Sequence, residues 1–379
     1  MTRNFFSSLI LWILCSFLVF FCFIVAASAQ GTKARPAHVG FIYPLSTNGT
    51  EAPQLTNNFS MHVLAGVSWQ ENAFCLSGIS SVVKHEAHGV MISGILNHVQ
   101  HKARGAQMAG VLNYIKGNAE GAQLAGLANI SGSADGAQLA GLANITKDAR
   151  GLQMAGFANK AGNSDAQVAG FGNIARNSDA VQVAGFINVA KDAHTQVAGF
   201  INVAKKVSGV QVAGFINIAE ESNYPIGLVN IIKNGEKQIG VSIDESASTM
   251  VTFRSGGKVL YGILGAGYNF KDEEARYVLE GGLGAHIAIS KSFRINLETV
   301  TMAMSDLQHD VYMKSALRIL AAYKIANRLE FFAGPSFNHL NYERGQTDIR
   351  DDHYLWKNRG KNHINGLYFG AIAGVQFNL

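Results

Sequence analysis

The stretch "VQVAGFINVAKDAHTQVAGFINVAKKVSGVQVAGFINIAEE" (residues 181–221) gives one short phrase three times. Each copy reads Gln, an apolar residue, Ala, Gly, an apolar residue, any residue, Asn and another apolar residue. Only the spacers between the copies differ. A phrase that returns at a fixed interval is the sequence signature of a repeat architecture, so this stretch decides the fold.

The same phrase extends over much of the chain with a period of about 15 residues. Spacers such as "KGNAEG" and "SGSADG" are rich in Gly, Asn and Asp, which tolerate the backbone of tight corners. An earlier unit has Met91 in the place of the Gln. The amides that recur are Gln107, Gln123, Gln138, Gln153, Gln167, Gln182, Gln196 and Gln211, with Asn97, Asn113, Asn129, Asn144, Asn159, Asn173, Asn188, Asn202, Asn217 and Asn230.

Two structures have this period. In a β-solenoid each unit is one coil, and stacking in register turns identical amides into ladders that bond their own copies. An antiparallel meander of ten-residue strands and five-residue turns has the same length, but it does not require the same amide in every strand. The solenoid is therefore favoured, and ten coils spaced ~4.8 Å apart would extend about 50 Å.

The recurring side chains have a structural interpretation and a functional one. We expect the amide ladders to satisfy backbone groups at corners, with a ligand-binding role as the alternative. An aromatic residue follows the Gly in five units, and we expect an inward stack rather than a sugar-binding face. These residues are Phe157, Phe171, Phe186, Phe200 and Phe215.

From residue 238 onward the apolar residues alternate with a period of two, which predicts strands. In "FRINLETVT" (293–301), Phe293, Ile295 and Leu297 oppose a polar face. The alternation predicts eight strands, most of them longer than is usual in soluble domains, at 238–245, 249–255, 258–270, 276–289, 292–304, 310–325, 328–342 and 363–379.

Strands of this length, with one apolar and one charged face, are typical of a small outer-membrane barrel. Eight strands suffice to close a barrel that its own side chains fill. We therefore predict an all-β chain in which a β-solenoid of ~15-residue repeats is followed by an antiparallel barrel of about eight strands. The charges expected in its lumen are Glu280, Arg294, Glu298, Lys314 and Arg318.

Two other arrangements of the C-terminal part remain open. It could be a β-sandwich of a soluble protein. Alternatively, the strand-like segments 38–49 and 58–68 could complete the barrel in place of 238–255, with the solenoid inserted between its strands.

The segment 1–29 ends in Ala27-Ser28-Ala29 after a long apolar run, the layout of a cleavable secretory signal, with an uncleaved anchor as the alternative. Cleavage would remove Cys15 and Cys22 and leave only Cys75, so no internal disulfide is expected. It would also leave 30 basic against 26 acidic residues without a basic cluster, which argues against nucleic acid binding.

The expected organisation is a signal (1–29), an N-terminal β segment or cap (30–84), the solenoid (85–237) and the barrel (238–379). Short turns such as 255–257, 290–292 and 326–327 alternate with longer polar loops such as 343–362. This alternation predicts that both ends of the barrel, and the repeat array before it, face the periplasm.

The sequence offers little chemistry. In "HEAHG" (85–89), His85 and His88 are three residues apart, which is not the metalloprotease spacing. A weak metal site with His98 and His101 is the alternative to solvated turn histidines. The sequence has no phosphate-binding loop, nucleophile elbow or calcium-binding β-roll motif, so we expect no enzymatic activity, no metal and no cofactor.

Three stretches resemble a known group of proteins. They are "YPLSTNGTEAPQLTNNFSMHVLAGVS" (43–68), the repeated "VQVAGFINVA", and the junction "YPIGLVNIIKNGEKQIGVSIDESASTMVTFRSGGKVLYGILGAGYNF" (224–270). They look like exported repeat proteins of Bacteroidetes-type bacteria, and the repeat is similar to a leptospiral surface-repeat family. The resemblance implies a cell-envelope protein without an established reaction.

The expected role is therefore structural or interactive, with outer-membrane lipid and an unidentified protein or envelope component as partners. The alternatives are a soluble periplasmic or secreted binding protein and, less favoured, a small channel. An eight-stranded barrel has little room for an open pore.

Overall fold

A computed structural model describes residues 34–308, 311–326, 328–350 and 353–379. The expected signal (1–29) lies outside these residues. The described chain is nearly all β, and it forms a solenoid of about 12 turns and a closed eight-stranded antiparallel barrel, which confirms the predicted fold class. The chain divides into two compact units, one that ends at Gly162 and one from Asn163 to Leu379. No helix in the described ranges is long and apolar enough to cross a membrane.

The described part of the first unit contains strands and one 3-10 helix, η1 (Gly49–Gln54). Its strands are β1 (Ala34–Ile42), β2 (Leu45–Ser46), β3 (Thr56–Ser68), β4 (Gln70–Ser77), β5 (Ser80–Val83), β6 (Ala87–Ser93), β7 (Leu96–Val99), β8 (Ala103–Ala109), β9 (Leu112–Ala125), β10 (Ala128–Ala140), β11 (Ala143–Ile145), β12 (Asp148–Ala155) and β13 (Ala158–Lys160).

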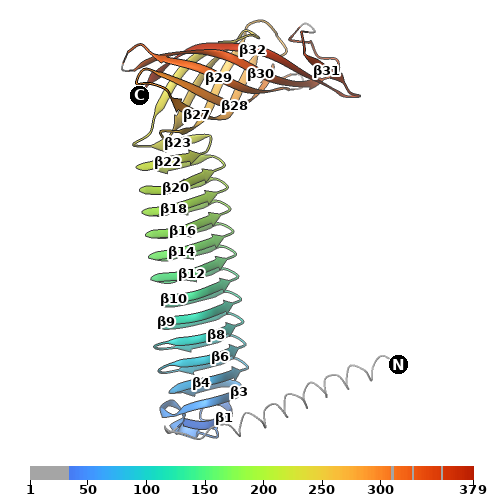
Figure 1. The fold of residues 1–379 in the computed structure, drawn as a ribbon. Helices are drawn as coiled ribbons and strands as arrows, with labels where there is room; N and C mark the ends of the chain where they lie inside the picture. Colours follow the sequence, from blue (N-terminus) through green and yellow to red (C-terminus); the bar gives the residue numbers. More distant parts are fainter. Residues whose placement is uncertain (1–33, 309–310, 327, 351–352) are drawn as a thin grey trace, which may run out of the picture. The chain divides into compact units, whose positions relative to one another are not determined.

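These strands pair in parallel with the coil above and the coil below, and identical residues face each other. Gln138 pairs with Gln153 between β10 and β12, and Asn129 pairs with Asn144 between β10 and β11. Figure 1 shows β4, β6, β8 and β9 one above another. The meander alternative is therefore wrong. Parallel pairing already begins between β1 and β3, ahead of the residue-85 boundary.

Glycine at the corner lets successive coils approach. A Cβ at Gly141 would collide with the backbone oxygen of Gly126 in the coil before it. Gly151, earlier in its own coil, has a φ of +106°, which other residues rarely adopt. The Ala-Gly pair in the phrase therefore follows from the backbone spacing of a stacked coil.

The second unit begins with coils of the same kind. Their strands are β14 (Asn163–Ala169), β15 (Gly172–Ile174), β16 (Asn177–Ala184), β17 (Ile187–Val189), β18 (Asp192–Ala198), β19 (Ile201–Val203), β20 (Lys206–Ala213), β21 (Ile216–Ala219), β22 (Glu221–Ile226) and β23 (Val229–Ile232). The pairing is again parallel and in register, as between Gln182 and Gln196. Figure 1 shows this succession from β14 to β22.

The barrel follows in the same unit. Its strands are β24 (Lys237–Asp244), β25 (Ser248–Gly256), β26 (Leu260–Asn269), β27 (Tyr277–Ala288), β28 (Phe293–Ser305), β29 (Tyr312–Lys324), β30 (Leu329–Glu343) and β32 (His363–Asn378). Each pairs antiparallel with the next, and β24 pairs with β32, for example Val241 with Val375, so the sheet closes.

Two sequence interpretations of the barrel need correction. Residues 38–49 and 58–68 lie in the parallel coils around β1 and β3, so the alternative that placed them in the barrel is wrong. The sandwich alternative is wrong because the eight strands close on themselves. In addition, the loop 343–362 contains a short strand that we did not predict, β31 (Trp356–Arg359), which pairs with the start of β32.

One end of the barrel rests on the last coil. The backbone N–H of Asn230 donates to Ser255 Oγ over 2.9 Å, and Asn230 Nδ2 donates to the carbonyl oxygen of Ser255 over 3.0 Å. The turn that follows Ser255 and the other two short turns lie at this end because antiparallel strands alternate direction. The longer loops lie at the opposite end, together with the short connection 245–247.

Candidate functional site

Exposed apolar side chains line the outer wall of the barrel. Along β29, buried and exposed residues alternate without interruption from Tyr312 to Ala321. The exposed members include Leu317 and Ile319, which are 56% and 50% exposed, while Lys314 and Arg318 are buried. This is the inverse of a soluble strand, which points its charged residues to water and its apolar residues to the core.

Aromatic side chains gather towards both ends of this wall. Near the coil, Tyr323 lies between Phe293 and Phe331 in the strand register. At the other end Tyr268 pairs with Tyr277, and their rings meet edge to face at 6.0 Å. Two aromatic rows that flank an apolar band are a feature of barrels that cross a bilayer.

The middle of the lumen holds a closed network of charges. Arg254 Nε donates to Glu298 Oε1 over 2.8 Å, and Tyr261 donates to the same oxygen over 3.0 Å. Arg318 Nη2 donates to Glu280 Oε2 over 2.9 Å, and its Nη1 lies 3.5 Å from Glu298 Oε2. All five side chains are buried, so each charge depends on its partners for stabilisation.

Two further networks fill the ends of the lumen. Near the coil, Arg294 bonds Glu330 over 3.0 Å and Glu236 over 2.6 Å. At the other end, Lys314 Nζ lies 2.8 Å from both Asp244 Oδ2 and Glu245 Oε1.

The structure brings the five charges named from the sequence into this lumen: Glu280, Arg294, Glu298, Lys314 and Arg318. Sequence reasoning missed their partners, which are Glu236, Asp244, Glu245, Arg254 and Glu330. Arg254 could have been found, because it alternates with the outward Val251 and Phe253 within a strand that was predicted. The arrangement as a whole is a packed set of ion pairs.

The amide ladders occupy the interior of the coils. All eight Gln and ten Asn side chains named from the sequence are at most 1% exposed. Asn202 Nδ2 donates to the Val212 carbonyl over 2.6 Å and to Asn217 Oδ1 over 3.0 Å, in the next coil. Gln196 Nε2 donates to Gln182 Oε1 over 2.8 Å, in the preceding coil. The two ladders therefore point their donors in opposite directions along the stack.

No family model matches this chain. No curated protein matches it either. A solved structure described as "De novo design of transmembrane beta-barrels" matches with 10% sequence identity and a TM-score of 0.24, over 38% of this chain and 93% of that chain. Identity and TM-score at this level support no argument about function, which therefore rests on the geometry of the chain itself.

The phenylalanine prediction is wrong. The side chains of Phe157, Phe171, Phe186, Phe200 and Phe215 are 39–49% exposed and lie outside the coil. Neighbouring rings stack nearly parallel, as Phe186 and Phe200 do at 5.0 Å. The interior cannot take them because small residues and the two amide ladders already fill it.

The histidines of the early repeats also line the outside of the coils. The ring of His85 stacks on that of Trp69 and is tilted against that of His101, with ring centroids 5.1 Å apart in both contacts. His98 meets Tyr114 edge to face, and His88 pairs with Glu86 over 3.1 Å. Within the described ranges no group of three or more His, Cys, Asp or Glu side chains could hold a metal ion.

The first coils contain a buried polar cluster that the sequence does not predict, because no repeated phrase marks this segment. His62 Nε2 lies 3.2 Å from His38 Nδ1, and Ser60 Oγ lies 2.8 Å from both carboxylate oxygens of Glu71. Burial raises the pKa of Glu71 to about 7, although Ser60 and Asn57 donate to it. Burial, followed by the charge of His38, lowers the pKa of His62 to about 4.

Proposed function

We propose that this chain is a non-enzymatic protein of the outer membrane of a Gram-negative cell, with a structural or interaction role. The observation that carries the proposal is the inverted barrel: closed, apolar outside and filled with paired charges. Exposing an apolar band of this extent to water is unfavourable, and covering it with lipid or another apolar surface is favourable.

The contents of the lumen support a structural role for the barrel. Arg254, Arg294, Lys314 and Arg318 each contact at least one buried carboxylate within 3.0 Å. A catalytic acid or base needs access to substrate, and a pore needs an aqueous path. Paired, packed charges favour neither, so we expect no enzymatic activity and no conductance in planar bilayers.

The periplasm is the proposed location of the coils. Both ends of the barrel chain lie at the end with the short turns, which faces the periplasm in outer-membrane barrels. The last coil bonds to the barrel at this same end through Asn230. The resemblance to exported repeat proteins of Bacteroidetes-type bacteria and to the leptospiral surface-repeat family supports an envelope location, as does the expected signal at residues 1–29.

Membrane fractionation tests the proposal. We expect the chain to sediment with outer membranes, to require detergent for extraction, and to migrate differently on a gel before and after heating, as a folded barrel does. A chain that stays in aqueous solution without detergent would instead be the soluble periplasmic or secreted protein, and the proposal would be rejected.

Protease treatment of intact cells tests the orientation. Coils in the periplasm are shielded until the outer membrane is made permeable. Cleavage of the spacers between repeats while the cells are intact would place the coils on the cell surface and refute the periplasmic location. The proposal of a membrane barrel would not be affected.

A further inference from the structure

The coils of the first unit carry an exposed apolar strip that their own stacking does not explain. It consists of two rows, three residues apart along the chain, on either side of the Ala-Gly corner. The strand row is Ile92, Met108, Leu124, Leu139 and Met154, and the corner row is Ile95, Val111, Leu127, Leu142 and Phe157. The two rows together are called the apolar strip below.

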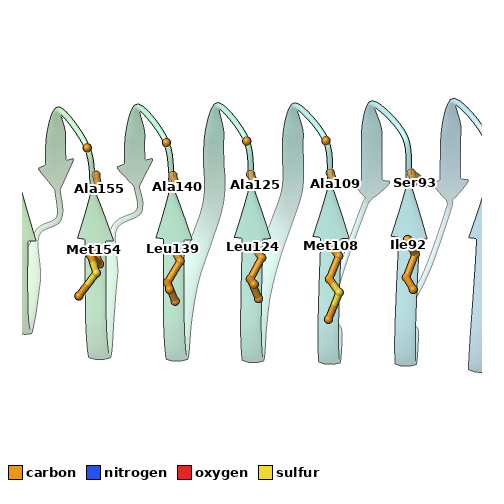
Figure 2. Close-up of a pocket in the computed structure, with 14 residues that line it drawn as sticks. Ile92, Ser93, Met108, Ala109, Leu124, Ala125, Leu139, Ala140, Met154 and Ala155 are labelled. Atoms are coloured by element: carbon orange, nitrogen blue, oxygen red, sulfur yellow. The ribbon is translucent and has the colours of Figure 1, made fainter.

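The strip is open and free of charge. The strand row borders a shallow groove of about 700 Å³ whose other lining residues are Ser93 and the Ala and Gly of the corner. Figure 2 shows Met108, Leu124, Leu139 and Met154 side by side, one from each coil and all pointing the same way. No ionisable side chain belongs to either row, so the surface fits an uncharged, apolar partner.

The strip is large enough for a stable interface. Nine of its ten side chains, all except Ile92, have exposed fractions between 37% and 49%. At about 75 Å² each, they offer about 700 Å², close to the ~800 Å² that each partner contributes to a typical stable complex. Patches above ~600 Å² are rare on monomers. In the coils of the second unit, exposed phenylalanines occupy the positions that correspond to the corner row: Phe171, Phe186, Phe200 and Phe215.

The spacing of the strip restricts the partner. Its apolar side chains recur once per coil, at about 4.8 Å. A partner that interdigitates along the whole strip needs the same repeat, and a second copy of this chain has it. An acyl chain on such an open surface would keep half of its own surface in water. A sugar is bound by aromatic ring faces, but Phe157 is the one aromatic residue among the ten of the strip.

We propose that two copies of this chain pair through the apolar strip, side by side and parallel. The parallel arrangement rests on the proposed membrane location, because two barrels in one membrane have the same orientation. A two-fold interface is self-complementary, so each coil meets the equivalent coil of the partner.

Thiol cross-linking in outer membranes tests the pairing at three heights. Cys75 is buried, so a cysteine introduced at the surface reacts over little background. The variants are Ile95→Cys, Leu127→Cys and Leu142→Cys, treated with a short bifunctional thiol reagent. The matched control is Lys147→Cys. Leu142 comes directly before β11, and the exposed Lys147 lies in the turn after it. We expect about tenfold more covalent dimer from each strip variant than from the control, because facing thiols have a high effective concentration.

Equal yields at Leu142 and Lys147, or no dimer at any position, would overturn the proposal. Cross-linking at only one of the three heights would indicate antiparallel or crossed copies and would also overturn it. The Leu127→Glu/Leu142→Glu variant gives a second readout: the mass of the particle in nanodiscs should fall from two copies to one. A mass that stays at two copies would contradict the interface.

Heat-modifiable migration of the same samples separates this proposal from the proposed function. If migration does not depend on heating but the strip variants cross-link, the proposal of a membrane barrel is rejected and the proposal of pairing is kept. If migration depends on heating and no strip variant cross-links, the pairing fails and the membrane barrel stands.

Discussion

At the scale of single residues, the buried Asn of each coil forms bonds that no apolar residue could replace. Asn202 reaches the Val212 carbonyl and Asn217, and it accepts from Asn188 over 3.0 Å. The sequence predicted such a ladder because identical residues at a fixed period must face each other in a stacked coil. The sequence also predicted backbone partners for these amides, but not which carbonyls accept, since that depends on the path of the corner.

We predict that Asn202→Ala destabilises its coil by about 2–3 kcal/mol, because it removes one hydrogen bond each from the Val212 carbonyl, Asn188 and Asn217 in the buried interior. Hydrogen exchange of the amides in β18 to β21 measures the loss. Lys205→Ala, in the same coil with an exposed side chain, is the control and should change little. Equal exchange in the two variants would show that the ladder is not stabilising.

We also predict a pH-dependent effect at Glu71. Its pKa is raised from an ordinary 4.5 to about 7, so the folded state binds a proton more tightly than the unfolded chain. The stability that this group contributes is present below pH 4.5 and is lost as the pH rises to 7. His62 has a lowered pKa and the opposite dependence, because its contribution is lost as the pH falls from 6.5 towards 4.

Glu71→Gln removes only the first of these dependences. Relative to the unmodified chain, the variant should gain about 3 kcal/mol between pH 4.5 and pH 8. Hydrogen exchange of β3 and β4 across this range measures the difference. If the difference between the two proteins does not change with pH, the buried carboxylate does not titrate as described.

At the scale of elements, the alternation of side chains predicted the barrel strands closely. The segment predicted at 276–289 is β27, Tyr277–Ala288, because inward and outward positions are set by the local backbone. The partner of each charge could not be predicted in this way. Arg254 and Glu298 are 44 residues apart, and only closure of the sheet brings them together. The short β31 was missed because four residues within a polar loop are too few to carry a periodic signal.

We predict that Glu298→Gln lowers the stability of the barrel by about 3–5 kcal/mol, because it leaves Arg254 and Arg318 with too little negative charge in a buried site. The temperature at which the folded band disappears from a gel measures the loss. Glu273→Gln, whose side chain is 92% exposed, is the matched control. Equal transition temperatures for the two variants would contradict the stabilising role of the lumenal network.

At the scale of the whole molecule, the chain combines two ways of closing a β-structure. The coils satisfy their backbone by parallel stacking, and the barrel does so by joining β24 to β32. The sequence separated the two because the long period of the tandem repeat gives way to a simple alternation of apolar and polar residues. It could not predict which side of the coil the phenylalanines occupy, since this depends on how narrow the interior becomes once the amides fill it.

The central claim is that lipid covers the barrel wall and does not cover the coils. Quenching of tryptophan by brominated acyl chains tests it most directly, in a Trp12→Phe/Trp69→Phe/Trp356→Phe background reconstituted in vesicles. We predict strong quenching of Leu317→Trp on the barrel wall and none of Leu139→Trp on the apolar strip. Quenching of neither variant, or equal quenching of both, would contradict the account.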